Sequence, residues 1–298
     1  MYFGIRNIRY TMDLNGKCAA YDVLADINYF PANGKVITTE EWKPRYLGVS
    51  DDFTRKMTIR DIRGMEDQFG LDRNGFKFVK LPSKDRSTED DETIKTQWYP
   101  EVAEVIKELT GASTVHIFNH CIRQCNEPVS KGKLDPLGRW LAAASGHPHV
   151  DYAARPEDIR GTLEELRFPA EIARRLEASP RFAFVNAWRP IKTVRRDPLA
   201  VADASTVPGL DYQIRARQFR PSGVRSANYV MSHGATEDRH AWYYMHEMQP
   251  DELVVFKNYD TKRDMPGWRC PHTAFEIPGT EDLPVRESIE IRAVCFWD

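Results

Sequence analysis

The sequence predicts a mainly β protein with flanking helices, of the β-sandwich or jelly-roll class. Short segments rich in β-branched and aromatic residues recur along the C-terminal half, whereas the helical patterns gather toward the N-terminal half. A parallel α/β sheet would need a helix between successive strands, and the C-terminal half leaves no room for one. With 298 residues, 41% of them hydrophobic, the chain can bury one large core.

Six strands are expected from these segments, each bounded by turn-forming residues. They are TVHIFNHCIR (114–123), RFAFVNAWRP (181–190), DPLAVADAS (197–205), HAWYYMHEM (240–248), DELVVFKNYD (251–260) and RESIEIRAVCFWD (286–298).

Helices are expected in two regions. The apolar residues of PEVAEVIKELTG (100–111) recur at i, i+3, i+4 and i+7, and its final glycine ends the pattern. Residues 156–179 predict two shorter helices separated by Pro169. Residues 57–82 predict a short helix, an Asn-Gly turn and then a strand.

The domain organisation is expected to be simple. No repeat or low-complexity segment stands out, so residues 1–298 are expected to form one domain. Within it, residues 1–57 are expected to be a β-rich N-terminal extension and residues 98–298 the jelly-roll core.

Composition excludes several classes of protein. Forty-two basic and 44 acidic residues give a net charge of −2, which provides no basic surface for a nucleic-acid backbone. No run of about 18 apolar residues would span a membrane, and the first residues lack the apolar segment of a signal peptide. Five dispersed cysteines without a C-x-x-C pair are typical of reduced thiols, so a cytoplasmic location is expected. The sequence also lacks the glycine-rich dinucleotide, P-loop and serine-hydrolase motifs.

The stretch HPHVDY (147–152) contains three residues able to bind a metal. In an extended strand His149 and Asp151 project from one face, and His147 shares that face. A further ligand must come from a distant segment, and RCPHTAF (269–275) supplies His272. Two imidazoles and one carboxylate leave coordination positions open, as non-haem Fe(II) requires, although zinc accepts the same ligands and a histidine near an aspartate is often only a surface pair.

The C-terminal strand adds a candidate anion site. Arg286 and Ser288 are two residues apart, so an extended chain places both on one face. A buried guanidinium beside a hydroxyl suits the distal carboxylate of 2-oxoglutarate, because the planar fork binds a carboxylate through two hydrogen bonds. The alternative pairs Arg286 with Glu287 or Glu290 on the surface, and Arg292 is then the next candidate for the anchor.

Together these motifs resemble the Fe(II)/2-oxoglutarate-dependent oxygenases. The phrases IRDIRGMEDQFGLDRNGF, VNAWRPI, DPLAVADAS, WYYMHEMQPDELVVFKNYD, PHTAF and VRESIEIRAV are similar to one branch. That branch is the secondary-metabolite hydroxylase/desaturase family of fungi and bacteria, which includes gibberellin desaturase-like, aspergillic-acid-type, cephamycin methoxylation-associated and meroterpenoid endoperoxide-forming proteins. The similarity extends from about residue 58 to the C-terminus and is strongest in the C-terminal phrases.

The resemblance implies a double-stranded β-helix with a defined set of site residues. Fe(II) would be held by His149, Asp151 and His272, with the family pattern selecting His149 over His147. 2-Oxoglutarate would be held by Arg286, with Ser288 added by the residue pattern described above. The phrase NAWRP implies that Asn186 and Trp188 line the co-substrate site.

The implied activity is the oxidation of a small natural product with O2, by hydroxylation, desaturation or endoperoxide formation. A zinc-type hydrolase with the same three ligands and a non-catalytic β-sandwich partner subunit are the alternatives. A homodimer is also expected. Arg123 is a further candidate for meeting an acidic substrate, with a structural salt bridge as the alternative.

Overall fold

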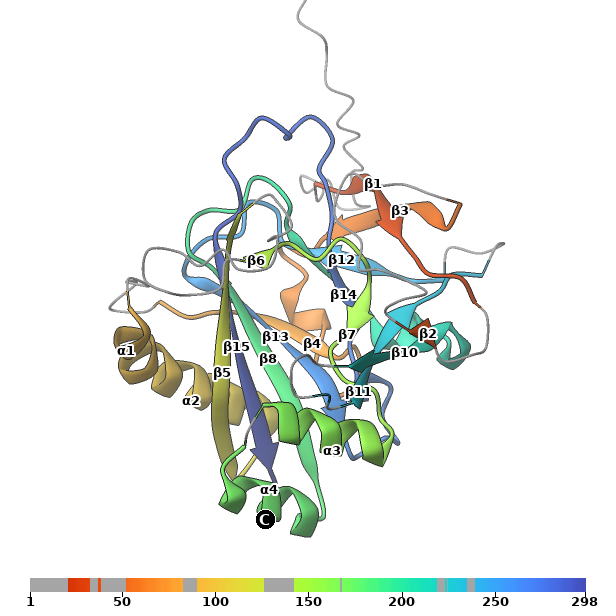
Figure 1. The fold of residues 1–298 in the computed structure, drawn as a ribbon. Coiled ribbons are helices and arrows are strands. Elements are labelled where there is room, and N and C mark those ends of the chain that lie inside the picture. Colours follow the sequence, from red (N-terminus) through yellow and green to blue (C-terminus); the bar gives the residue numbers. More distant parts are fainter. Residues whose placement is uncertain are drawn as a thin grey trace, which may run out of the picture.

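The structure is a computed structural model that describes residues 21–32, 37–38, 52–82, 90–125, 142–166, 168–218, 223, 225–234 and 239–298. It consists of two curled β-sheets with helices at the periphery (Figure 1). The larger sheet has nine strands in the order β1-β3-β12-β9-β14-β7-β11-β10-β2, and the smaller has six in the order β4-β13-β8-β15-β5-β6. Most neighbouring strands are antiparallel. The predicted mainly β, jelly-roll class is confirmed.

The strand bounds are as follows. The nine-stranded sheet contains β1 (Val23–Asn28), β2 (Ile37–Thr38), β3 (Thr54–Asp61), β7 (His149–Val150), β9 (Leu199–Ala202), β10 (Tyr212–Gln218), β11 (Arg225–Met231), β12 (Trp242–Tyr244) and β14 (His272–Ala274). The six-stranded sheet contains β4 (Phe76–Lys80), β5 (Thr114–Cys125), β6 (Ala142–Ala143), β8 (Phe182–Pro190), β13 (Glu252–Asp260) and β15 (Ser288–Phe296).

The helices are short. They are α1 (Asp91–Thr93), the π-helical turn η2 (Ile94–Trp98), α2 (Tyr99–Thr110), α3 (Pro156–Glu165) and α4 (Ala170–Ala178), with 3-10 turns η1 (Glu66–Gln68), η3 (Ala204–Thr206), η4 (Gly209–Asp211) and η5 (Pro266–Trp268). As predicted, α2 ends where Gly111 adopts φ +66°, and Pro169 separates α3 from α4.

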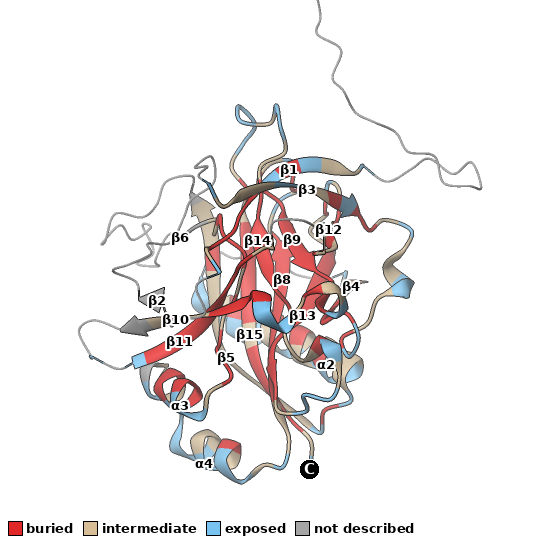
Figure 2. Ribbon diagram, turned by 90° about the vertical axis from the view of Figure 1, so that its right-hand side faces the viewer, coloured by how far each residue is buried: buried red, intermediate tan, exposed pale blue. Residues whose placement is uncertain are grey.

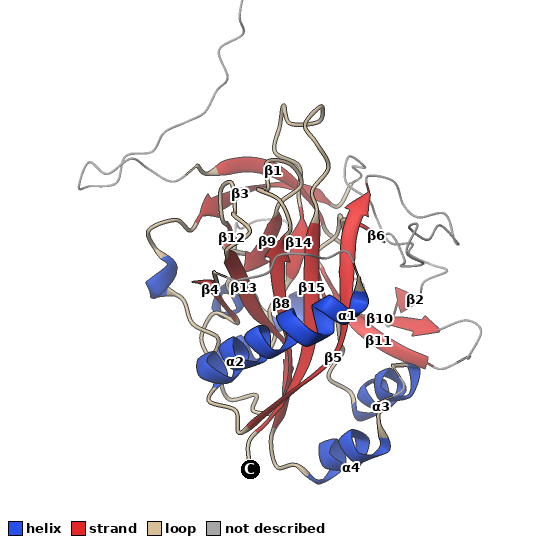
Figure 3. Ribbon diagram, turned by 90° about the vertical axis from the view of Figure 1, so that its left-hand side faces the viewer, coloured by secondary structure: helices blue, strands red, loops and turns tan. Residues whose placement is uncertain are grey.

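Helix α2 covers the outer face of the six-stranded sheet. Its apolar stripe, represented by Val102 and Ile106, packs against a cluster that includes Ala187 and Ile289 from β8 and β15. Figure 3 shows α2 lying across this sheet, while α3 and α4 lie at one end of the molecule. The opposite face of the six-stranded sheet therefore packs against the nine-stranded sheet.

The main core lies between the two sheets. Val150, Phe275 and Trp242 come from the nine-stranded side, and Phe184 and Val294 from the six-stranded side. The strands are buried along most of their length (Figure 2). This core fixes the relative positions of the strands that carry the candidate site residues.

Several local predictions need correction. Residues 147–152 do not form one strand, because β7 contains only His149 and Val150 and Asp151 lies in a bend. Residues 57–61 belong to β3, which pairs with β1 and β12, and the predicted short helix is the 3-10 turn η1. Gly75 adopts φ +85° at the predicted Asn-Gly turn, directly before β4.

The expected N-terminal extension lies largely outside the described residues. Its described strands β1 and β2 occupy the two edges of the nine-stranded sheet, and β3 begins within it. Strand β3 belongs to the nine-stranded sheet and β4 to the six-stranded sheet. The division into residues 1–57 and 98–298 stays a prediction.

Candidate metal centre and co-substrate cavity

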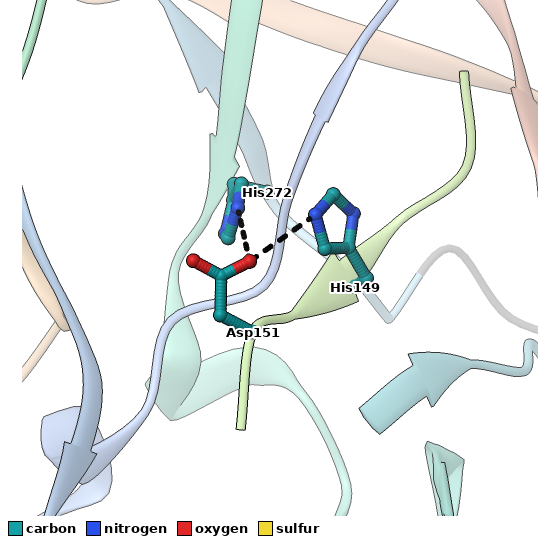
Figure 4. A group of neighbouring side chains, drawn as sticks. All are labelled: His149, Asp151 and His272. Atoms are coloured by element: carbon teal, nitrogen blue, oxygen red, sulfur yellow. Dashed lines mark ion pairs between the residues drawn. The ribbon is translucent and has the colours of Figure 1, made fainter. Parts of the chain in front are cut away.

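Three candidate metal ligands come together although they are far apart in the chain. His149 begins β7, and His272 begins β14, the neighbouring antiparallel strand, where the two histidines face each other directly. Asp151 follows β7 in the bend. The three side chains point toward one another (Figure 4), and one ligand atom from each lies within 4.8 Å of the other two.

Hydrogen bonds orient both imidazole rings. The Nδ1 atom of His149 is 2.9 Å from the carbonyl oxygen of His147, and Nδ1 of His272 is 3.2 Å from that of Cys270. Because a carbonyl oxygen only accepts, each Nδ1 carries the hydrogen, which leaves Nε2 with a free lone pair. These Nε2 atoms lie 3.6 and 3.9 Å from Asp151 Oδ1. Metal–ligand bonds of about 2.1 Å give separations of about 3.0 to 3.4 Å between neighbouring ligand atoms, so small side-chain movements would bring the three groups onto one ion.

The two oxygens of Asp151 have different surroundings. Oδ1 faces the histidines, whereas Oδ2 accepts a 2.9 Å hydrogen bond from the side-chain amide of Asn186 and lies 3.7 Å from Nε of Arg292. Burial alone would raise the pKa of Asp151, but the charge of Arg292 and the Asn186 hydrogen bond hold that pKa well below its usual value. The carboxylate is therefore ionised.

His149 is neutral. Burial, followed by the neighbouring His272 and His147, holds its pKa well below the ordinary value. A neutral imidazole is the form that binds a metal, so no proton has to leave His149 first.

His147, the rival ligand, lies outside this group. Its ring packs edge-on against Phe30 at a centroid distance of 5.4 Å, and its Nδ1 is 3.5 Å from the Ser145 hydroxyl. Its backbone carbonyl accepts the hydrogen bond from His149. His147 thus contributes to orienting His149.

The candidate ligands line a cavity that is partly open to solvent. Both sheets contribute to its wall. The lining residues are Arg123, Ser145, His149, Asp151, Trp188, Leu199, His272, Thr273, Ala274, Arg286 and Glu290.

Arg286 is buried in the wall of this cavity, 6% exposed, just before β15. Its Nη1 donates to the carbonyl oxygen of Asp197 at 2.7 Å, and its guanidinium carbon lies 5.3 Å from the centre of the Trp188 ring. Burial and the nearby Arg123 lower its pKa to about 10, so it stays charged at neutral pH. The surface ladder with Glu287 is wrong, since Glu287 instead binds Lys192.

At the start of β15, two buried hydrogen-bond donors have no partner among the described residues. They are Nε of Arg286 and Oγ of Ser288. The extended chain continues through Glu287, whose carbonyl accepts from Ile191 N, so alternation turns Arg286 and Ser288 to the same side. Buried donors normally have acceptors, and a carboxylate would provide them.

The structure gives the remaining candidates different surroundings. Trp188 lines the cavity, and its contact with the co-substrate stays a prediction. Asn186 donates a hydrogen bond to Oδ2 of Asp151, the carboxylate oxygen that does not face the histidines. Arg292, the alternative anchor, pairs with Glu290 at 2.5 Å and lies 3.7 Å from Asp151. Its positive charge therefore balances these two carboxylates.

Sequence reasoning missed two residues of this region. Glu290 lines the cavity, and its place in the alternating series 286, 288, 290 and 292 was the available signal. The Asn258 side chain accepts a 3.0 Å hydrogen bond from the backbone N–H of Asp151. Nothing in the local pattern of β13 indicates that contact.

Comparison with known proteins identifies the family. Residues 27–296 match the family described as oxidoreductase/YMDC permease-like domain. The hydroxylase/desaturase efuI of Hormonema carpetanum is 36% identical over 82% of this chain and 84% of its own length. The alpha-ketoglutarate-dependent dioxygenase phiK of a fungal species is 37% identical, with 82% and 84% covered. Among the described residues, no helix has the length and apolar character needed to cross a membrane.

Solved structures agree with these relatives. The iron and alpha-ketoglutarate-dependent endoperoxidase NvfI superposes with a TM-score of 0.72 at 25% identity, covering 93% of this chain and 98% of NvfI. The chain belongs to this family of oxidoreductases, as an Fe(II)/2-oxoglutarate-dependent oxygenase of secondary metabolism. The predicted enzyme class and the cofactors Fe(II) and 2-oxoglutarate are confirmed, in preference to the hydrolase and partner-subunit alternatives.

Proposed function

We propose that His149, Asp151 and His272 hold Fe(II), and that Arg286 and Ser288 bind the distal carboxylate of 2-oxoglutarate. The observation that supports this assignment best is the pair of unpartnered donors on Arg286 and Ser288. A bound carboxylate would provide acceptors for both, and Arg286 lines the same cavity as the three ligands.

The three ligand side chains would already have the protonation states and orientations that metal binding needs. Asp151 stays ionised, His149 stays neutral, and both imidazoles present Nε2 toward the position of the ion. Because these states exist without metal, little reorganisation is needed on binding.

When bound, Fe(II) and 2-oxoglutarate would supply the oxidising power for the substrate, with O2 consumed and the keto acid converted to succinate and CO2. The chain itself positions the participants. Arg286 and Ser288 fix one end of the keto acid, Trp188 covers the Arg286 guanidinium, and Leu199 and Ala274 add apolar wall. No protein acid or base is needed for removal of a hydrogen atom from carbon.

A small natural product is the proposed substrate. The relatives include proteins named hydroxylase/desaturase and an endoperoxidase, so hydroxylation, desaturation and endoperoxide formation are the outcomes considered. Which of them occurs depends on where the cavity places the substrate carbon. A zinc hydrolase would leave the Arg286 and Ser288 donors without a role.

Location and assembly belong to the same proposal. Cys121, Cys270 and Cys295 are free thiols, which suits the reducing cytoplasm. The near-neutral charge argues against a nucleic-acid partner. The homodimer stays a prediction.

Iron binding by ligand variants tests the assignment. Under anaerobic conditions the wild-type chain is expected to bind one Fe(II), and Asp151→Ala or His272→Ala is expected to bind none at the same concentration. His147→Ala is the matched control and is expected to keep one Fe(II). Loss of iron from His147→Ala with retention in His272→Ala would overturn the assignment.

A further inference from the structure

Strand β13 contains an irregularity opposite β8. Lys257 pairs with Val185 and Tyr259 pairs with Phe184, so Asn258 is an extra residue with no counterpart on β8. This is a β-bulge, which breaks the two-residue alternation and redirects a side chain.

The bulge contacts both segments that carry the proposed metal ligands. The side-chain oxygen Oδ1 of Asn258 accepts from the backbone N–H of Asp151 at 3.0 Å. The carbonyl oxygen of Lys257 accepts from the backbone N–H of Cys270 at 2.8 Å, and the carbonyl of Cys270 in turn accepts from Nδ1 of His272. Two adjacent residues of the six-stranded sheet therefore hold two ligand segments of the other sheet.

Ion pairs fasten the bulge on both sides. Nζ of Lys257 lies 3.0 Å from Oδ2 of Asp260 and 2.8 Å from Oδ1 of Asp72. Asp260 also accepts from Arg181 at 2.9 Å. The Lys257 and Asp260 side chains are at most 1% exposed, so they are held in one arrangement.

The asparagine side chain at position 258 is expected to lower the free energy of unfolding. Its Nδ2 atom is buried without a hydrogen-bond partner among the described residues, and so is Oδ1 of Asn186, the other amide that contacts Asp151. A buried unpaired polar atom costs about 1–3 kcal/mol. Each of these side-chain amides thus makes one hydrogen bond, to Asp151, while its other polar atom stays unpaired. Such a cost to folding is expected of groups that serve a functional site.

We propose that Asn258 is a positioning residue for the metal centre, aimed at Asp151 by the Lys257–Asn258 bulge. Asn258 holds the backbone N–H of Asp151, while Asn186 holds its carboxylate oxygen Oδ2. Together they leave Oδ1 facing the two histidines. This role rests on the proposed function, because it presumes that Asp151 is a ligand.

The test is the Fe(II) affinity of Asn258→Leu, measured by anaerobic equilibrium titration. Loss of a group that orients a metal ligand typically weakens metal binding by about 10- to 100-fold, and that is the expected rise in the dissociation constant. The visible spectrum of bound Co(II) is expected to change as well, since it reports ligand geometry independently of turnover. Asn258→Ala repeats the test without added bulk if the leucine variant does not fold.

Asn74→Leu is the matched control. Asn74 is also buried and also accepts from a backbone N–H, that of Gly70, but its other contact is Asp203. This variant is expected to be less stable and to keep wild-type Fe(II) affinity and the wild-type Co(II) spectrum.

Wild-type metal affinity and an unchanged Co(II) spectrum in a folded Asn258 variant would overturn the positioning role. That failure is distinguishable from failure of the proposed function, in which Asp151→Ala itself would bind iron normally. Lys257→Met is expected to weaken binding less than Asn258→Leu, and the double variant is expected to be no weaker than Asn258→Leu alone. Additive effects would show that Lys257 does not act through Asn258.

Discussion

The side-chain amide of Asn186 donates to Asp151 Oδ2 at 2.9 Å, which turns the other carboxylate oxygen toward His149 and His272. Asn186 comes from β8 of the six-stranded sheet and Asp151 from the bend after β7 of the nine-stranded sheet. The contact therefore joins the two sheets at the proposed iron site. Asp151 also lines the cavity that is proposed to hold the keto acid.

Replacement of Asn186 separates metal binding from keto-acid binding. Asn186→Leu removes the hydrogen bond to Oδ2 and is expected to weaken Fe(II) binding by about tenfold or more. 2-Oxoglutarate binding at saturating iron is expected to change little, because Arg286 and Ser288 are untouched. Anaerobic titrations with Fe(II) and with 2-oxoglutarate measure the two dissociation constants. A change in the 2-oxoglutarate constant alone would indicate that Asn186 lines the co-substrate site instead.

Variants of Arg286 test the carboxylate anchor. Arg286→Ala removes a charged donor and is expected to raise the 2-oxoglutarate dissociation constant by about 10- to 100-fold, with iron affinity unchanged. Arg286→Lys is expected to recover little of this loss, because an ammonium lacks the planar fork.

Ser288→Ala completes this series. It removes one neutral donor and is expected to have a smaller effect than Arg286→Ala. Calorimetry under anaerobic conditions gives all three constants. An unchanged keto-acid constant in Arg286→Ala would move the anchor to Arg123, which lines the same cavity.

The Arg292–Glu290 pair should be required for stability as a pair. Arg292→Met leaves the Glu290 carboxylate, 6% exposed, without its cationic neighbour and is expected to lower the free energy of unfolding by about 3 kcal/mol. The double variant Glu290→Met/Arg292→Met is expected to recover only the part of that loss due to Glu290, because Asp151 still lacks its Arg292 neighbour. Chemical denaturation of the metal-free protein measures both, and a double variant as unstable as the sum of the single ones would contradict the pairing.

His240 should make the fold sensitive to acid. Trp242 donates to the Tyr29 hydroxyl, so that hydroxyl donates to Nδ1 of His240, and the hydrogen on Nε2 goes to Asp211. Burial is the main cause that lowers the pKa of His240 to about 4. The neutral ring is therefore the form that this chain of hydrogen bonds accommodates.

The direction of the pH effect follows from this lowered pKa. The ordinary histidine pKa is about 6.5, so between about pH 6.5 and 4 the unfolded chain binds the proton more readily than the folded one. The contribution to stability is complete above about pH 6.5 and declines by on the order of 3 kcal/mol as the pH falls to about 4. Denaturation across this range measures it, with His240→Gln expected to show a shallower decline. Equal slopes would assign the acid sensitivity to other groups.

Alternation along strands explains what could be predicted from the sequence. Arg286 and Ser288 face one side because the chain is extended there, and His149 meets His272 because their strands are neighbours. The resemblance supplied the pairing of those strands, since the distance along the chain does not. Short strands such as β7 carry too little pattern to define their ends.

The less predictable features arise where alternation fails or where partners come from distant segments. Asn258 was missed because a bulge in β13 changes the direction of its side chain. Arg292 lies in the same alternating series as Arg286, but its neighbours Asp151 and Glu290 give it a different role. Only the packing of the two sheets decides which of the two arginines reaches the open cavity.

The most direct test of the central claim is the visible spectrum of the anaerobic protein with saturating Fe(II) and 2-oxoglutarate. The predicted result is a weak charge-transfer band from iron-chelated keto acid, present in the wild type and absent in Asp151→Ala. A wild-type protein that binds Fe(II) and 2-oxoglutarate but shows no such band would contradict the account.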